Sequence, residues 1–340
     1  MKNLITLERF NEITKGFQSL KPIVVIGDVG IDKYTFGEVK RISPEAPVPV
    51  LEVTKEWLKL GLAANISHNL STLGVASTLC GVVGEDSNAN VFDSLLEDEN
   101  LNTWGIVRTS SRPTIFKERV TTNTQQICRI DYESSDPIDE VTEKKIMARA
   151  DEFSQTHSAI IIEDYAKGTL TKAVIAYLIE KFKANGKLVA VDPGRSTPPL
   201  YYKGATLLKP NLAEAKYMVE SLGFKEKRLE VMAEILVDKL AIEKLVITLG
   251  GDGMALIDTK IQSHLTIIPT LANEVFDVSG AGDTAISALT SALLSGATLE
   301  EAAWIGNCAS GVVVGKKGTA TVDLLELREF YDQIRAKKIL

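Results

Sequence analysis

The chain has 340 residues, of which 45% are hydrophobic and 24% charged, as is typical of a globular protein with a sizeable core. Lys and Arg total 38 against 45 Asp and Glu, giving a formal net charge of −7, and no basic stripe stands out, so nucleic acid is a poor candidate partner. The three cysteines show no CxxC spacing, which argues against a disulfide framework and a zinc site. No apolar run reaches the roughly 18 residues of a membrane span, and the N-terminus lacks a signal-peptide core, so we expect a cytoplasmic protein.

The predicted elements alternate between short apolar strands and amphipathic helices. Residues 1–20 carry apolar side chains at helical spacing, which predicts a docked N-terminal helix. The expected strands are 23–27, 77–83, 159–162, 187–191, 206–208 and 245–249. The expected helices are 63–73, 143–153, 172–182, 229–240, 281–294 and 299–314. This alternation indicates βαβ units and a mostly parallel sheet covered on both faces, within a single unit spanning 1–340.

Two segments break the alternation. Residues 34–54 contain three prolines and no helical period, and residues 112–133 read as two short strands around a Thr/Asn turn. Neither suits a central strand of a parallel sheet, because Pro cannot donate a ladder hydrogen bond. We expect a small accessory β-sheet that could act as a lid over a site, with ordinary surface hairpins as the alternative.

The most informative motif is Asp277-Val-Ser-Gly-Ala-Gly-Asp283, which opens a long helix. Gly280, Ala281 and Gly282 leave backbone amides unobstructed at the helix N-terminus, where an anion is favoured. Beside such an anion site Asp283 could act as a general base in phosphoryl transfer. The alternative is a carboxylate that only stabilises the first helical turn.

Two further loops follow predicted strands. Thr248–Gly253 (TLGGDG) is a glycine-rich turn that would let a nucleotide lie against the backbone. Asn211 and Glu214 could orient a hydrated Mg²⁺ or simply cap a helix. The chain has neither a Walker P-loop nor a GxGxxG fingerprint, which argues against a P-loop nucleotidase and a dinucleotide-dependent dehydrogenase. Such loops at the carboxyl ends of strands mark the ligand-binding edge of an open α/β sheet.

A second polar set also follows strand ends and would suit hydrogen bonds to sugar hydroxyls. Each member could equally be a turn or cap residue. The set is Asp28, Asp32, Asn65 after Gly61, Asp164 and Lys167.

Together these residues resemble the ribokinase-like (PfkB) carbohydrate kinases, from about residue 22 to residue 325. The family patterns DTxGAGD, TLGxxG and NxxE are matched by residues 277–283, 248–253 and 211–214. One subgroup, the D-glycero-β-D-manno-heptose 7-phosphate kinases, is similar over more of the chain. The matching stretches are RISPEAPVPV at 41–50, NTQQICRID at 123–131, DYAKG at 164–168 and GVVVGK at 311–316.

The resemblance implies a three-layer α/β/α domain with a β-sheet lid that often pairs two subunits, hence a homodimer. It implies ATP- and Mg²⁺-dependent phosphorylation of the anomeric C1 hydroxyl. The product would be the 1,7-bisphosphate used for ADP-heptose and the lipopolysaccharide core. Many relatives carry an adenylyltransferase domain as well; we expect that activity, and the pathway's phosphatase, in separate proteins.

The resemblance also implies roles for individual residues. Asp283 would be the base and the amides of Gly280, Ala281 and Gly282 the anion hole. Asn211 and Glu214 would handle phosphate and Mg²⁺, Glu214 through water; Thr248, Gly250 and Gly253 would lie near the nucleotide and Asn307 beside the adenine. The heptose would be surrounded by Asp28, Asp32, Gly61, Asn65, Gln126, Asp131, Asp164 and Lys167. Asp277 would help bind a monovalent cation such as K⁺.

The 7-phosphate needs cations in an acidic protein. The candidates are Arg41, Lys167, Arg195 and Lys209, with Arg41 preferred because it lies in the most specific stretch.

Two departures from the subgroup pattern bear on the sugar. Leu62 stands where the subgroup has a second glycine, and Gly194-Arg195 stand where a lysine follows Asp-Pro. They leave open a kinase of the same family acting on fructose, ribose or another heptose phosphate. A catalytically silent sugar- or nucleotide-binding regulator is a further alternative.

Overall fold

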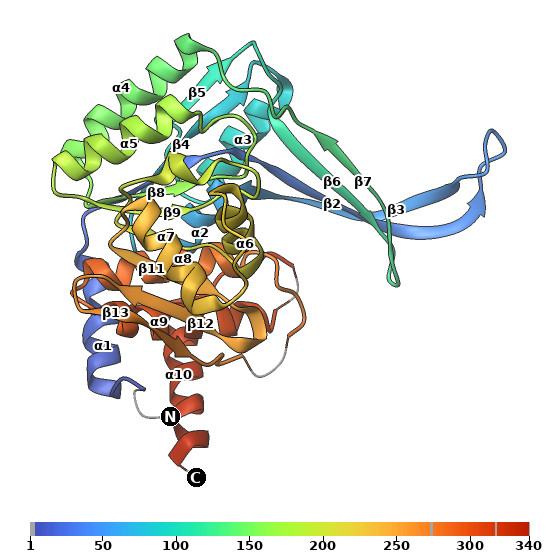
Figure 1. Cartoon of the computed structure of the whole chain (residues 1–340). Coiled ribbons are helices and arrows are strands. Elements are labelled where there is room, and N and C mark those ends of the chain that lie inside the picture. Colours follow the sequence, from blue (N-terminus) through green and yellow to red (C-terminus); the bar gives the residue numbers. More distant parts are fainter. Residues whose placement is uncertain (1–3, 273–274, 317, 340) are drawn as a thin grey trace.

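The computed structural model describes residues 4–272, 275–316 and 318–339 and is built on a nine-stranded sheet in the order β13-β12-β11-β10-β9-β8-β1-β4-β5 (Figure 1). The parallel strands are β1 (Ile23–Gly27), β4 (Ser77–Gly84), β5 (Ile106–Thr109), β8 (Ala159–Glu163), β9 (Leu188–Asp192), β10 (Leu207–Leu208) and β11 (Lys244–Thr248). Two antiparallel strands, β12 (Met254–Asp258) and β13 (Gln262–Ile268), complete one edge. The mostly parallel α/β fold predicted from the sequence is confirmed.

Helices cover both faces of this sheet. One face carries α1 (Leu7–Gly16), α2 (Ala63–Thr72), α3 (Ser87–Asp98), α8 (Ala281–Leu294), α9 (Leu299–Val313) and α10 (Leu324–Ile339). The other carries α4 (Glu140–Thr156), α5 (Lys172–Ala184), α6 (Leu212–Ser221) and α7 (Leu229–Leu240). Alternate residues of β1 enter the two cores, Ile23 and Val25 on one side and Val24 and Ile26 on the other. Burial on both faces explains why this strand is apolar at consecutive positions.

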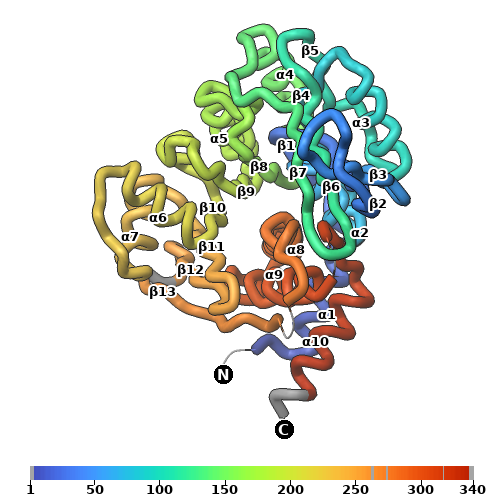
Figure 2. Tube along the Cα trace, turned by 90° about the vertical axis from the view of Figure 1, so that its right-hand side faces the viewer, coloured from blue at the N-terminus to red at the C-terminus, as the bar shows by residue number. Residues whose placement is uncertain are grey.

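The first and last helices lie side by side (Figure 2). Phe10 of α1 stacks on Tyr331 of α10 with ring centroids 4.1 Å apart, and the Tyr331 hydroxyl donates to the Ile5 carbonyl. The apolar spacing of the N-terminal residues is thus used to bury Phe10 and Ile13. None of the helices in the described ranges combines the length and apolarity needed to cross a membrane.

The sequence analysis predicted α7 and α8 with their observed bounds, gave α6 only as a helix that Asn211 could cap, and missed α3 and the antiparallel edge. Only the 3₁₀ turn η3 (Gly250–Asp252) and its flanking residues separate β11 from β12. A connection of that length cannot make a parallel crossover, so the chain must turn back as a hairpin.

The expected accessory sheet exists and has four strands in the order β3-β2-β6-β7. They are β2 (Val29–Ile42), β3 (Pro49–Leu62), β6 (Ile115–Thr121) and β7 (Gln126–Tyr132), and we call them the small sheet. The β2–β3 hairpin is longer than the predicted segment 34–54 and projects from the body of the molecule (Figure 1). Its base begins directly after Asp28 and ends directly before α2. The prolines mark only its outer part, which is why the sequence underestimated its length.

Candidate active site

Asp283 lies in the first turn of α8 and is 8% exposed. The Asn65 amide of α2 donates to its Oδ2 (2.5 Å), and the Tyr165 hydroxyl donates to its Oδ1 (3.3 Å). Burial raises the pKa of Asp283 to about 6, with Asp192 adding to the rise and the Asn65 hydrogen bond opposing it. The carboxylate is therefore a stronger base than an ordinary Asp and remains mostly ionised at neutral pH.

The glycines before Asp283 let other side chains approach the start of α8 closely. Gly280 has φ +80°, and a Cβ there would lie 3.0 Å from the Asn65 amide nitrogen. A Cβ on Gly282 would lie 3.5 Å from Lys209 Nζ. The backbone of residues 280–282, which the sequence predicted as an anion hole, thus lies between an amide donor and an ammonium.

Three carboxylates meet beneath this helix end. Glu163 is the last residue of β8 and Asp192 the last of β9, and their oxygens and one of Asp283 all lie within 4.8 Å of one another. Lys209, after β10, forms an ion pair with Asp192 (2.8 Å). Oε2 of Glu163 has no hydrogen-bond partner among the described residues, and burial together with Asp192 and Asp283 raises the pKa of Glu163. The sequence analysis missed this cluster: Glu163 and Asp192 each directly follow a predicted strand, but only the structure shows that the two strands are neighbours.

Asn211 and Glu214 form a capping box at the start of α6. The Asn211 side chain accepts from the Glu214 N–H (2.9 Å), and Glu214 Oε2 accepts from the Asn211 N–H (2.8 Å). Glu214 Oε1 lies 3.9 Å from Arg195 Nε, too far for a hydrogen bond. Burial and the neighbouring Asp192 raise the pKa of Glu214. The capping interpretation is therefore correct, yet it leaves one carboxylate oxygen of the half-buried Glu214 for a hydrated cation.

The glycine-rich turn after β11 combines one tight position with an open one. Gly253 has φ +100°, and a Cβ there would lie 2.0 Å from the Ile268 carbonyl oxygen. No atom of the residues that the structure describes lies within 4 Å of a Cβ on Gly250 or Gly251, so that side of the turn is free to face a ligand. Thr248 forms a bridge to Asn211, which brings this turn beside α6.

Several predicted ligands are engaged by the chain itself. Asp28 is fully buried and its oxygens accept the backbone N–H groups of Tyr165, Lys167 and Thr169. Asp164 accepts from the hydroxyls of Thr197 (2.7 Å) and Tyr202 (2.6 Å). Because these oxygens are already used, the structure assigns both aspartates to holding the 164–169 loop.

Asn307 of α9 is also engaged within the fold. Its amide donates to the Pro269 carbonyl (2.7 Å) and accepts from the Leu271 N–H (3.2 Å). This side chain fixes the segment after β13, as the helix-packing alternative suggested.

The remaining predicted sugar residues lie on the small sheet, except Lys167, which lies in the loop between β8 and α5. Asp32 is paired with Arg119 of β6 (2.6 Å), and a Cβ on Gly61 would lie 2.8 Å from Asp32 Oδ2. Lys167 is paired with Glu133 just beyond β7. Both Gln126 and Asp131 lie on β7 and are exposed. Arg119 and Glu133 had not been singled out, because an ion pair between residues far apart in the chain cannot be read from spacing.

The preferred contact to the 7-phosphate, Arg41, is not near Asp283 within this chain. Arg41 is exposed near the outer end of β2, opposite Val50, whereas Asp32 lies near the base of the same strand. At about 3.3 Å per residue the two are roughly 30 Å apart along the strand. Arg195, another candidate, has a side chain that is 89% exposed, and its Nε lies 3.9 Å from Glu214 Oε1.

Asp277 precedes α8, and its oxygens accept the N–H groups of Ser279 (2.9 Å) and Gly318 (3.2 Å). Burial acts to raise the pKa of Asp277, but these hydrogen bonds outweigh it and lower the pKa. The group is therefore an ionised anchor for the loop that leads into the helix.

Leu62 keeps a glycine-like backbone at the junction of β3 and α2. Its φ of 58° and ψ of −136° are unusual for a leucine, and its side chain is 8% exposed. The substitution therefore places a buried side chain next to Asn65's helix at the expense of backbone strain.

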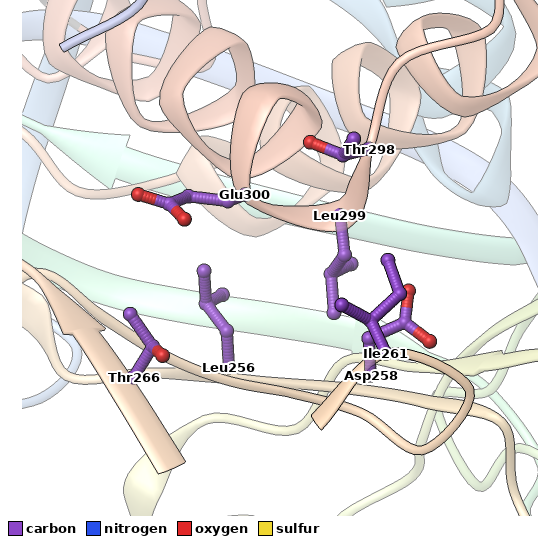
Figure 3. Close-up of a pocket in the computed structure, with 7 residues that line it drawn as sticks. All are labelled: Leu256, Asp258, Ile261, Thr266, Thr298, Leu299 and Glu300. Carbon is purple, nitrogen blue, oxygen red and sulfur yellow. The ribbon is translucent and has the colours of Figure 1, made fainter. Parts of the chain in front are cut away.

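A separate small cavity of about 150 Å³ lies between β12, the β12–β13 turn and the start of α9 (Figure 3). Its lining includes Leu256, Ile261 and Leu299 and none of the predicted site residues. We assign it no role in the chemistry.

Comparison with known proteins agrees with this geometry. Residues 22–326 match the family described as pfkB family carbohydrate kinase. The chain is 40% identical over 317 residues to the bifunctional protein HldE of Nitratiruptor sp. (93% of this chain, 66% of that protein) and 41% identical to that of Wolinella succinogenes (92% and 65%). It thus spans just under two thirds of the length of these relatives.

Solved structures show the same fold at lower identity. Ribokinase from Thermotoga maritima superposes with a TM-score of 0.74 at 19% identity (92% of this chain, 99% of that chain). Phosphofructokinase-2 from Escherichia coli in complex with potassium gives 0.74 at 18% identity (93% and 99%). On the strength of the family match, the chain belongs to the pfkB family of carbohydrate kinases.

Proposed function

We propose that this chain is an ATP-dependent kinase that phosphorylates the anomeric C1 hydroxyl of D-glycero-β-D-manno-heptose 7-phosphate. The observation that carries the kinase chemistry is the buried Asp283 at the glycine-lined start of α8, held by Asn65 and Tyr165. The heptose phosphate is supported by the stretch at 41–50 and by the similarity to the HldE proteins. The 1,7-bisphosphate would serve ADP-heptose and lipopolysaccharide core synthesis.

In the proposed reaction Asp283 takes the proton of the sugar hydroxyl as the sugar oxygen bonds to the γ-phosphorus. The bond from that phosphorus to the bridging oxygen breaks, and ADP leaves with the electron pair. The N–H groups of residues 280–282 stabilise the phosphoryl oxygens. An anomeric hydroxyl is more acidic than an ordinary alcohol, which suits a carboxylate whose pKa is about 6.

The nucleotide would lie along the open side of the Gly250–Gly251 turn, with Thr248 and Gly253 shaping that turn. Glu214 offers an oxygen without a close partner in the described part of the chain, and with Asn211 it would hold Mg²⁺ through water. When bound, the ion neutralises charge on the phosphates. A monovalent cation near Asp277 remains part of the proposal.

The sugar would lie between Asp283 and the small sheet. Asn65 and Asp32 border this region at the base of the hairpin, next to Gly61. Lys167 is the candidate for the 7-phosphate on the same side, since Arg41 is too distant within one chain. Gln126 and Asp131 would contribute only if the exposed strand β7 closes over the substrate.

The small sheet also supports a homodimer. It exposes apolar side chains and has two edge strands, β3 and β7, with free backbone groups. The exposed apolar residues are Val39 (38%), Ile42 (60%), Val53 (54%), Ile130 (40%) and Tyr132 (54%). We expect Val53→Lys to halve the mass measured by light scattering, while Val141→Lys on the exposed face of α4 leaves it unchanged. A monomeric wild type would contradict this assignment.

Leu62 favours one alternative, a kinase of the same family for another sugar. Coupled ADP release with D-glycero-β-D-manno-heptose 7-phosphate, fructose 6-phosphate and ribose separates the two. We expect the highest kcat/KM with the heptose phosphate, and phosphate at C1 of the product. Preference for either other sugar would reject the heptose assignment.

A further inference from the structure

Lys209 is a buried cation that the proposed mechanism does not yet use. It lies between β10 and α6, is 2% exposed, and its Nζ is 2.8 Å from Asp192 Oδ2. A fully buried lysine is rare in proteins unless it is paired. Its position beside Gly282, 3.5 Å from where a Cβ would be, brings the ammonium to the start of α8.

The charges around Lys209 come from four different elements. Glu163 of β8, Asp192 of β9 and Asp283 of α8 form the buried carboxylate cluster, and Glu214 of α6 lies on the nucleotide side. Burial acts to lower the pKa of Lys209, but Asp192, Glu163 and Glu214 outweigh it and raise the pKa. The ammonium therefore stays charged among groups that would repel an incoming phosphate.

An anionic phosphoryl group that comes within reach of Asp283 must pass this cluster of negative charge. The N–H groups at the helix start offset part of the repulsion, but they carry only partial charges. The ammonium of Lys209 adds a full positive charge beside these N–H groups. It therefore offsets more of the repulsion at the place where the phosphoryl group is transferred.

We propose that Lys209 is a further catalytic residue, whose ammonium contacts the phosphoryl group as it passes from ATP to the sugar. The inference rests on the proposed kinase function and adds an electrostatic contact to it. Lys209 exchanges no proton in this step, and Asp192 is a positioning residue that holds the ammonium. In this proposal Lys209 contacts the transferred phosphoryl group and not the 7-phosphate of the sugar, for which the sequence made it a candidate.

The first test is Lys209→Met, which keeps the side-chain length and removes the charge. We expect kcat to fall roughly 10²–10³-fold, with a smaller change in the KM of the sugar. The acid limb of the pH profile should move to higher pH, because the ammonium lowers the pKa of Asp283. Lys209→Arg should regain part of the activity, and Lys225→Met, an exposed lysine before α7, should match the wild type.

A second variant separates catalysis from structure. Lys209→Met combined with Asp192→Asn replaces the ion pair by a neutral pair of similar shape, so folding should tolerate it better. We expect turnover to stay within about tenfold of the single variant. The acid limb should return toward the wild-type position, because Asp192 and Lys209 shift the pKa of Asp283 in opposite directions. Thermal unfolding verifies that both variants are folded, and recovery of wild-type turnover in the double variant would overturn the proposal.

The measurement is made with whichever sugar the wild type phosphorylates fastest, and also on ATP hydrolysis without sugar. Wild-type preference for ribose or fructose 6-phosphate would defeat the heptose assignment while leaving the Lys209 test intact. Unchanged kcat and an unmoved acid limb in Lys209→Met would defeat the Lys209 inference while leaving the kinase assignment intact.

Discussion

Replacing Asp283 by Asn should stabilise the fold while it removes activity. The pKa of this carboxyl rises from 3.8 to about 6 on folding, chiefly through burial. A pKa unit corresponds to about 1.4 kcal/mol, so ionising the buried group costs the folded state on the order of 3 kcal/mol. An uncharged amide of the same shape avoids that cost.

The sign of the effect fixes its pH dependence. The folded carboxyl binds a proton more tightly than the unfolded one, so the cost is absent below roughly pH 4, where both forms are protonated. It grows between about pH 4 and 6 and is fully present above the folded pKa. The stability gain of Asp283→Asn should therefore appear at pH 8 and vanish at pH 4.

Urea unfolding at both pH values measures this difference, and coupled ADP release measures turnover. We expect a gain of about 1–3 kcal/mol at pH 8, the range allowing for altered hydrogen bonds to Asn65 and Tyr165, and a kcat lowered roughly 10²–10⁴-fold. Asp238→Asn, an exposed carboxylate on α7, is the control and should change neither. A gain independent of pH would refute the electrostatic reasoning, and near-normal turnover would remove Asp283 from the role of base.

Further predictions concern the neighbours of this group. Asn65→Ala should move the acid limb of the kcat/KM profile to a pH above the wild-type value near 6. In the wild type the Asn65 hydrogen bond lowers the pKa of Asp283, so its loss should raise that pKa; an unmoved limb would contradict this. Gly253→Ala should destabilise the protein by roughly 3 kcal/mol or more in urea unfolding, since its Cβ would meet a backbone carbonyl at φ +100°. Gly251→Ala should leave stability unchanged and raise the KM for ATP, and an unaffected KM would place the nucleotide elsewhere.

Asp283, which we propose as the base, and the glycines before it could be located from the sequence because they are contiguous, from Gly280 to Asp283. The carboxylate cluster could not, because Glu163 and Asp192 come together only through the pairing of β8 with β9. Lys209 joins them through the next strand along. Proximity across a parallel sheet depends on strand order, which local spacing does not reveal.

Two other outcomes depend on three-dimensional features in the same way. Asp28 follows a strand end as a ligand would, but only the fold brings the N–H groups of Tyr165, Lys167 and Thr169 onto it. Arg41 lies in the most specific sequence stretch, but the length of β2 carries it away from Asp283. A motif thus identified the family more reliably than it located a side chain.

The hairpin of the small sheet is a long arm on a narrow base. Its two strands join the main body at adjacent points, because Val29, the first residue of β2, pairs with Leu62, the last residue of β3. A rotation of a few degrees there produces a large displacement of the outer end, which lies about 14 residues away along β2. The base of the hairpin adjoins α2, the helix that carries Asn65. A force on the outer end of the hairpin therefore also acts on the amide that donates to Asp283.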